Sequence, residues 1–242
     1  MSTVATLPAH LRAPRARRIS LLAKWPLGLS LTSWRYMWRI TPLHRSETPG
    51  DPVADAAPGL PEWLDDSHLQ DVDAGVGALF HRRYGIEVRG SDMEPERLMT
   101  TVTSDLDGIA PSELVSFDKV RGRPAEMRRN DEYVVRMPAP WDGPVRVVDV
   151  TPTSFWLVTL TGHIEAGQIQ FRATSRDGVL GFEIESWARN GDQLAALLYD
   201  QMRMAKEVQL HMWTSVLERI ARIAGGRLAG GVTIETRRVA AP

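Results

Sequence analysis

The stretch that decides the fold is residues 192–224, DQLAALLYDQMRMAKEVQLHMWTSVLERIARIA. It contains no Pro or Gly and consists largely of strong helix formers. Asp192 can cap its start, and Gly225 and Gly226 can end it. At about 1.5 Å per residue such a helix is roughly 50 Å long, which is enough to cross a small sheet. Apolar side chains recur along it at steps of three, four and seven, which predicts one apolar face: Leu194, Leu198, Met202, Ala205, Met212, Val216 and Ile220.

The sequence before this helix predicts an antiparallel sheet. Short runs rich in Val, Ile, Phe and Trp alternate with turn-forming Pro, Gly, Asp and Thr, and this spacing indicates a meander of hairpins. The strongest candidate strands are residues 132–137, 145–151, 154–161, 167–174 and 180–188. Further predicted elements are strands at 80–88 and 115–120, a helix at 94–106 capped by Ser91 or Asp92, and an added edge strand at 232–236.

This order of elements is typical of the α+β class. Residues 155–158, Phe-Trp-Leu-Val, are apolar on both faces of their predicted strand, so that strand must be covered on both sides. We expect the helix at 192–224 to cover one side. We expect the Trp-rich residues 19–40 to cover part of the other side.

Composition narrows the class of protein. A chain of 242 residues with 43% hydrophobic residues can form one domain with an extension, or two small domains. It has no Cys, which excludes a disulfide framework and a thiolate zinc site and fits the cytoplasm. The longest apolar run, residues 19–31, is interrupted by Lys24 and Pro26 and is too short to span a membrane. No cleavage site follows Arg17 and Arg18, so we do not expect secretion.

Charge is distributed unevenly along the chain. Residues 1–50 hold eight Lys or Arg and one acidic residue, whereas the remainder is acidic. Within them, residues 19–40 mix Trp and Tyr rings with cations, which suits docking on the protein's own body, a membrane surface or a partner protein. We favour docking on the body. The acidic body argues against a nucleic-acid partner.

Five Pro residues within residues 41–62 predict a linker. The chain is therefore expected to divide into a basic, Trp-rich extension with a Pro-rich linker, residues 1–62, and a folded domain, residues 63–242. Both a monomer and a homodimer are compatible with these features.

Three pieces of the sequence resemble a known family: Trp-Asp-Gly-Pro at 141–144, Gly-His-Ile-Glu-Ala-Gly-Gln-Ile at 162–169, and the helical residues 198–210. They are similar to an uncharacterised family found in actinobacteria, with plant relatives, that is grouped with the START/SRPBCC helix-grip superfamily. The resemblance covers roughly residues 75–225, and Gly-His-x-Glu-x-Gly is its most specific part. It implies a curved antiparallel sheet wrapped around a long C-terminal helix with a cavity between them. It implies no particular chemistry, because the family has no settled activity.

His163 and Glu165 are the first candidates for chemistry. In a strand they point to the same side. A His beside a carboxylate can be held in one tautomer and act as a general base. The alternative is a hydrogen-bonded turn that sets the curvature of the sheet. Two ligands do not make a metal site, and no Gly-rich phosphate loop or dinucleotide fingerprint occurs, so neither a metal nor a cofactor is expected.

The predicted helix carries a second candidate set. Its polar residues can form a solvent-exposed ladder of pairs spaced four apart, or anchor a ligand at the cavity wall. Met side chains on the neighbouring turns suit an adaptable wall. The ladder residues are Arg203, Lys206, Glu207, Gln209 and His211, and the predicted ligand-binding residues are Lys206, Glu207, Gln209, Met202 and Met212, with Trp156 from the sheet.

Glu183 and Glu185 alternate with Phe182 and Ile184, and we expect both carboxylates to face solvent. Taken together, the sequence favours a protein that binds a small apolar or amphipathic molecule between sheet and helix. One alternative is an enzyme of the cyclase, dehydratase or hydrolase type that uses His163 and Glu165. The other is an interaction or membrane-surface protein that acts through residues 19–40.

Overall fold

The computed structural model describes residues 41–64, 68–112, 115–136, 142–191 and 199–241, with the side chains of residues 199–208 left out. In order along the chain its elements are β1 (Leu43–Pro49), η2 (Glu62–Leu64), η3 (Val72–Ala74), β2 (Val76–Arg89), α2 (Pro95–Ser104), α3 (Leu106–Ile109), β3 (Ser116–Arg121), β4 (Glu132–Arg136), β5 (Asp142–Thr151), β6 (Ser154–Thr159), β7 (Glu165–Arg176), β8 (Val179–Asn190), α5 (Tyr199–Ala224) and β9 (Arg227–Val239).

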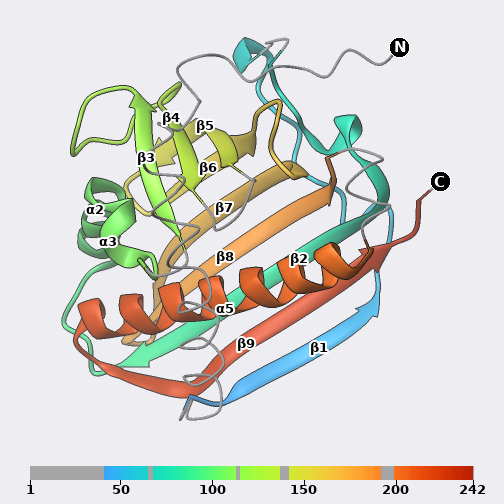
Figure 1. Ribbon diagram of the computed structural model, residues 1–242. Helices are drawn as coiled ribbons and strands as arrows, with labels where there is room; N and C mark the ends of the chain where they lie inside the picture. Colours follow the sequence, from blue (N-terminus) through green and yellow to red (C-terminus); the bar gives the residue numbers. More distant parts are fainter. Residues whose placement is uncertain (1–40, 65–67, 113–114, 137–141, 192–198, 242) are drawn as a thin grey trace, which may run out of the picture.

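The described strands form one sheet of nine, in the order β1-β9-β2-β8-β7-β6-β5-β4-β3. Strands β3 to β8 follow one another as antiparallel neighbours, which confirms the predicted meander. Helix α5 lies across one face of this curved sheet (Figure 1). The helix-grip fold is therefore confirmed. In the described ranges no helix is both long and apolar enough to cross a membrane.

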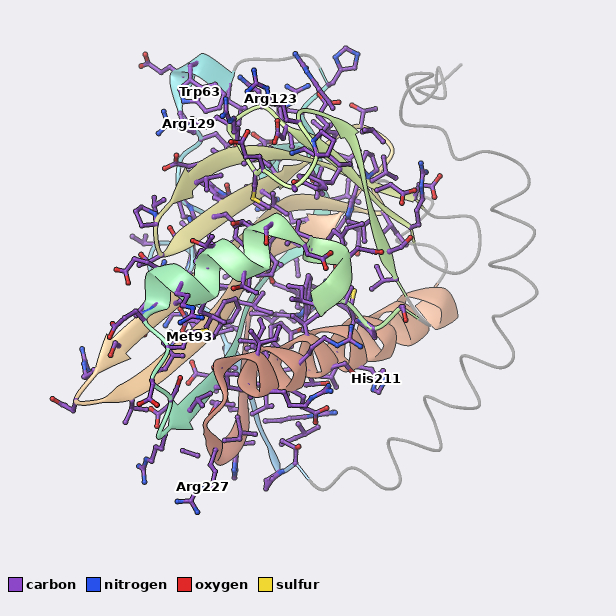
Figure 2. The ribbon with its side chains drawn as sticks, turned by 90° about the vertical axis from the view of Figure 1, so that its left-hand side faces the viewer. Trp63, Met93, Arg123, Arg129, His211 and Arg227 are labelled. Carbon is purple, nitrogen blue, oxygen red and sulfur yellow. The ribbon has the colours of Figure 1, made fainter. Side chains whose placement is uncertain are left out.

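The core lies between α5 and the sheet. Val216, Leu217 and Ile220 on α5 are at most 1% exposed, because the apolar face of the helix packs onto apolar side chains of the central strands. Helices α2 and α3 pack beside α5 on the same side of the sheet (Figure 2). Arg219 of α5 joins them, since its Nη1 donates to the carbonyl oxygens of Gly108 at 2.8 Å and Ala110 at 2.6 Å.

Strand β6 has apolar residues on both faces, and both faces are covered as predicted. Phe155 and Leu157 belong to the core beneath α5, whereas Val158 packs with Leu64 on the other side of the sheet. The covering side chains among the described residues include Leu60, Leu64 and Leu69. Residues 19–40, which we expected to provide part of this cover, lie outside the described residues, so their docking stays a prediction.

The linker predicted at 41–62 is partly wrong. Its residues 43–49 form β1, which runs parallel to β9 with Leu43 opposite Val232 and Pro49 opposite Arg238. Almost all side chains of β1 are exposed, so the strand is held by backbone pairing to β9. Backbone pairing of this kind requires no alternation of apolar residues, and the sequence therefore gives no sign of the strand. The strand expected at 232–236 is the longer β9, and β1 lies outside it, so β9 is not the edge. The division of the chain at residue 62 remains a prediction.

Candidate functional site

The Gly-His-x-Glu-x-Gly segment forms the corner between β6 and β7. The side-chain amide of Gln70 donates to the carbonyl oxygens of His163 at 2.8 Å and Glu165 at 3.0 Å, and its oxygen accepts from the Gly162 N–H at 3.2 Å. Gln70 belongs to the segment that covers the face of the sheet away from α5. One side chain therefore ties that segment to the corner, as expected for a turn with a structural role.

The His163 ring is held by the backbone. Nδ1 lies 2.9 Å from both the N–H and the carbonyl oxygen of Glu165, so the Glu165 backbone holds the ring in either tautomer. A Cβ at Gly143 would lie 2.9 Å from Nε2 of His163, so the ring packs directly onto Gly143. Burial lowers the pKa of His163, which keeps the ring neutral. This geometry favours the structural turn over the general base.

The Glu165 carboxylate turns toward α5. Its Oε2 accepts from Nε2 of Gln209 at 3.1 Å, and its Oε1 lies 3.9 Å from Nη1 of Arg82. The structure thus brings together two residues that the sequence placed in separate candidate groups, Glu165 and Gln209. Arg82, on β2, completes a polar group between the sheet and the helix, and nothing in its local sequence marks it.

Arg82 is buried, with 6% of its surface exposed, and its guanidinium lies 4.7 Å from the ring centroid of Phe80. It pairs in register with Ser186 of β8, so the two side chains share the face beneath α5. Trp213 of α5 packs edge-on against Phe171 of β7, with 5.5 Å between ring centroids.

Arg82, Ser186 and Trp213 each carry one buried polar atom without a hydrogen-bond partner among the described residues. Arg82 Nη1, Ser186 Oγ and Trp213 Nε1 are buried and form no hydrogen bond within the part of the chain that the structure describes. We call Arg82, Ser186 and Trp213 the donor cluster. A buried polar group without a partner destabilises a fold by about 1–3 kcal/mol, so these three groups on one face carry an energetic cost.

Solvent reaches the same region. Strand β7 is the middle strand of the sheet, yet Ile169, which pairs with Ser186 and lies on the α5 side, is only half-buried. The Glu165 side chain is 31% exposed, and Gln209 and Leu210 are half-buried. The donor cluster therefore lies next to an accessible end of the space between sheet and helix.

A family described as Domain of unknown function (DUF1990) matches residues 80–219, more than half of the chain. This range contains all three pieces of sequence that carry the resemblance, the donor cluster, Glu165 and Gln209. The chain belongs to the DUF1990 family. The resemblance inferred from the sequence is thereby confirmed. No protein among those with curated function matches the chain.

Solved structures similar to this DUF1990 chain include norcoclaurine synthase from Thalictrum flavum, at 9% identity over 68% of this chain and 97% of that one, with a TM-score of 0.42. Ara h 8.0201 is 14% identical over 60% of this chain and 97% of its own, with a TM-score of 0.40. Major latex-like protein 151 from Panax ginseng is 12% identical over 60% of this chain and 98% of its own, with a TM-score of 0.37. At these values the likeness carries no argument about the site.

The other predicted ligand-binding residues have different positions in the DUF1990 chain. Met212 is buried in the core beneath α5. Trp156 lies on the opposite face, where it packs with Val158 and Leu64, so it cannot line a space between the sheet and α5. The reason is the two-residue period of β6, which sends Phe155 and Leu157 toward the helix. The side chains of Met202, Arg203, Lys206 and Glu207 lie outside the described residues.

His211, expected on a solvent-exposed ladder, is 6% exposed. Glu185, expected to face solvent, is 5% exposed, whereas the side chain of Glu183 on the same strand face is 37% exposed and pairs with Arg172 at 3.4 Å. Both expectations, for His211 and for Glu185, are wrong: Glu185 lies beside the buried His81 ring, and a local polar pattern does not show such contacts. In the described ranges no group of three or more His, Asp or Glu side chains could hold a metal ion.

Sequence reasoning missed a charged cluster on the face away from α5. His81 of β2 contacts Asp55 through Nδ1 at 2.8 Å and Glu185 through Nε2 at 2.8 Å, and its ring stacks on Trp187 with 5.0 Å between centroids. Glu185 also accepts from Arg83 Nε at 2.7 Å. Asp55, Glu185 and His81 are separated by 26 and 104 residues, so no local signal could have joined them.

The charges of this cluster follow from its hydrogen bonds. Burial opposes protonation of His81, but the hydrogen bonds to Glu185 and Asp55 outweigh it and raise its pKa above the ordinary 6.5. Burial works against the two carboxylates, but their bonds to His81 contribute to a net lowering of the pKa of Asp55 and Glu185. Both ring nitrogens are occupied, so this cluster fastens the segment around Asp55 to β2 and β8 and has no atom left for catalysis.

Proposed function

We propose that this DUF1990 protein binds a small apolar or amphipathic molecule between the sheet and α5. The observation that carries the proposal is the donor cluster, whose three buried polar atoms form no hydrogen bond among the described residues. A bound molecule that hydrogen-bonds to them removes an energetic cost that the protein alone bears. Natural ligand sites commonly combine an apolar surface with a few such oriented polar groups.

The surroundings of the donor cluster support the same proposal. The neighbouring side chains beneath α5 are aromatic and aliphatic, including Phe155, Phe171 and Leu157. An apolar ligand portion gains roughly 25 cal/mol for each Å² that it removes from water against such a surface. Half-buried Ile169 indicates where a ligand can approach.

Native mass spectrometry after purification without detergent tests the proposal. We expect the protein to carry a molecule of one-to-one stoichiometry that is released on unfolding and recovered by organic extraction. Ser186→Phe places a ring beside Arg82 and is expected to abolish that species. Glu183→Phe is the matched control, because Glu183 lies on the same strand but on the opposite, exposed side.

Two results would contradict the proposal. One is a Ser186→Phe protein that folds and retains the bound molecule in the same amount as wild type. The other is a wild-type protein that yields no molecule and also fails to bind any aliphatic chain added in solution.

A further inference from the structure

We infer that the ligand's polar end carries a hydrogen-bond acceptor, a carbonyl or carboxylate oxygen, bound by Arg82 together with Ser186 and Trp213. The inference rests on the proposed function and adds the chemical class of the ligand's polar end. It excludes ligands whose polar end is a cationic amine.

The argument begins with the kind of atom that lacks a partner. A guanidinium nitrogen and an indole nitrogen can only donate, and a hydroxyl can donate or accept. Arg82 Nη1, Trp213 Nε1 and Ser186 Oγ are therefore all satisfied by an acceptor. An ammonium group offers only donors, so it would leave Arg82 and Trp213 unsatisfied.

Charge favours the same choice. Arg82 carries a positive charge with 8% of its side chain exposed, and a desolvated charge acts more strongly on its neighbours than one in water. An oxygen acceptor forms a charge-assisted hydrogen bond with it, whereas an ammonium meets a like charge.

Glu165 is the described residue that could attract a cation instead. Its Oε2 already accepts from Gln209 at 3.1 Å, and its Oε1 faces Arg82 Nη1 at 3.9 Å. Its side chain is 31% exposed, so water weakens its field more than that of Arg82. The Arg82–Glu165 separation is too long for a hydrogen bond, which leaves the Arg82 donor open to an acceptor.

The donors come from both layers of the fold. Arg82 and Ser186 pair in register on β2 and β8, and Trp213 comes from α5. An oxygen bound among them links the sheet to the helix. Ile169, which pairs with Ser186 on β7, offers an apolar surface for the chain attached to that oxygen.

Isothermal titration of the ligand-stripped protein with three aliphatic probes tests this inference. The probes are decanoate and 2-undecanone, which carry a nonyl chain, and decylammonium, whose decyl chain is one carbon longer, so that chain length works against the expected result. We expect decanoate or 2-undecanone to bind about tenfold more tightly than decylammonium, the scale of one charge-assisted hydrogen bond. Tighter binding of decanoate identifies an anionic acceptor, and tighter binding of 2-undecanone a neutral one.

Two variants connect the preference to the donor cluster. Arg82→Met keeps the side-chain length without the donors, and Ser186→Ala removes one hydroxyl in a change small enough to preserve the fold. Both are expected to weaken binding of the preferred acceptor, with Arg82→Met reducing its advantage over decylammonium to about threefold or less. Arg227→Met, at an exposed position at the start of β9, is the matched control and should bind as wild type does (Figure 2).

The outcomes separate the two proposals. If none of the three chains binds, the proposed function fails. If the chains bind but decylammonium equals or exceeds both acceptors, the acceptor inference is overturned while the binding function stands. If both Arg82→Met and Ser186→Ala retain the wild-type preference, the donor cluster is not the site of recognition.

Discussion

His81 Nε2 lies 2.8 Å from Glu185 Oε1, and the two residues come from the neighbouring strands β2 and β8. The other ring nitrogen of His81 contacts Asp55 at 2.8 Å, from the segment that covers this side of the sheet. One imidazolium therefore connects two strands to the covering segment. Because Arg83 and Arg237 also face these carboxylates, the cluster is a small charged network rather than an isolated pair.

This cluster predicts a pH dependence of stability. The pKa of His81 is raised, so its contribution is complete below the ordinary 6.5 and is lost as pH rises through the raised value. The pKa values of Asp55 and Glu185 are lowered, so their contributions are complete above the ordinary 3.8 and 4.5 and are lost as pH falls through the lowered values. The cluster should stabilise the protein most between about pH 4.5 and 6.5.

The variant His81→Gln checks this dependence. It should lower the free energy of unfolding by about 3 kcal/mol at pH 6, because it leaves two buried carboxylates without their shared cation. The difference from wild type should shrink toward pH 9. Urea unfolding at several pH values measures it, with exposed His68→Gln as control. The quantity to compare is the difference in unfolding free energy between wild type and His81→Gln. The lowered pKa of His163 changes stability with pH in the opposite direction, but it does so in both proteins and therefore cancels in this difference. A difference that is constant from pH 6 to 9 would contradict the assignment.

A second prediction concerns the buried pair of Glu132 and Arg146, whose side chains approach to 2.8 Å. Glu132→Leu alone should destabilise the protein by about 3–5 kcal/mol, because the Arg146 charge then stays buried without the Glu132 carboxylate. Glu132→Leu combined with Arg146→Met should recover most of that loss. Equilibrium unfolding in urea provides both values.

The exposed pair of Glu126 and Arg128 serves as control for the buried pair, since its atoms lie 2.9 Å apart but both side chains are about half exposed. Glu126→Leu should change the free energy of unfolding far less than Glu132→Leu does, because water screens an exposed ion pair. Similar losses at Glu126 and Glu132 would show that burial does not set the strength of these pairs.

Removal of residues 1–60 deletes β1, Asp55 and Leu60, and exposes Val158 and its neighbours. We expect lower solubility and a free energy of unfolding reduced by at least about 3 kcal/mol. Removal of residues 1–40 alone keeps all of those contacts. Any loss in that shorter deletion measures docking of residues 19–40, which we favour. Full stability combined with lost co-sedimentation with anionic vesicles would instead support membrane contact.

The packing of His163 on Gly143 leads to a further prediction. In Gly143→Ala the new methyl group would lie 2.9 Å from His163 Nε2, so the ring must move and the protein should lose about 1–3 kcal/mol of stability. Combining it with His163→Ala should cost less than the sum of the single changes. Gly59→Ala, which meets no atom within 4 Å, should be close to neutral in the same thermal-melting series. Equal effects at positions 59 and 143 would refute the contact.

Local periodicity determined the elements that lie in the middle of the molecule. The candidate strand at 132–137 is β4, Glu132–Arg136, and the candidate at 180–188 lies within β8, Val179–Asn190. The apolar stripe of the last helix predicted which of its residues face the core, as Met212, Val216 and Ile220 do. These predictions succeeded because alternation and helical spacing are properties of neighbouring residues.

The tertiary structure decided what local patterns cannot contain. Strand β1 has no apolar alternation, because the backbone of β9 holds it. Glu185 and Glu183 share a strand face, yet only Glu185 is buried, beside the His81 ring that Asp55 contacts from a distant segment. Which face of β6 packs against α5 decided that Trp156 points away from the helix, and strand register placed Arg82 beside Ser186. The sequence by itself determined the helix, the meander and the family motif, whereas the donor cluster and the His81 cluster exist only because folding brings distant segments onto the two faces of one sheet.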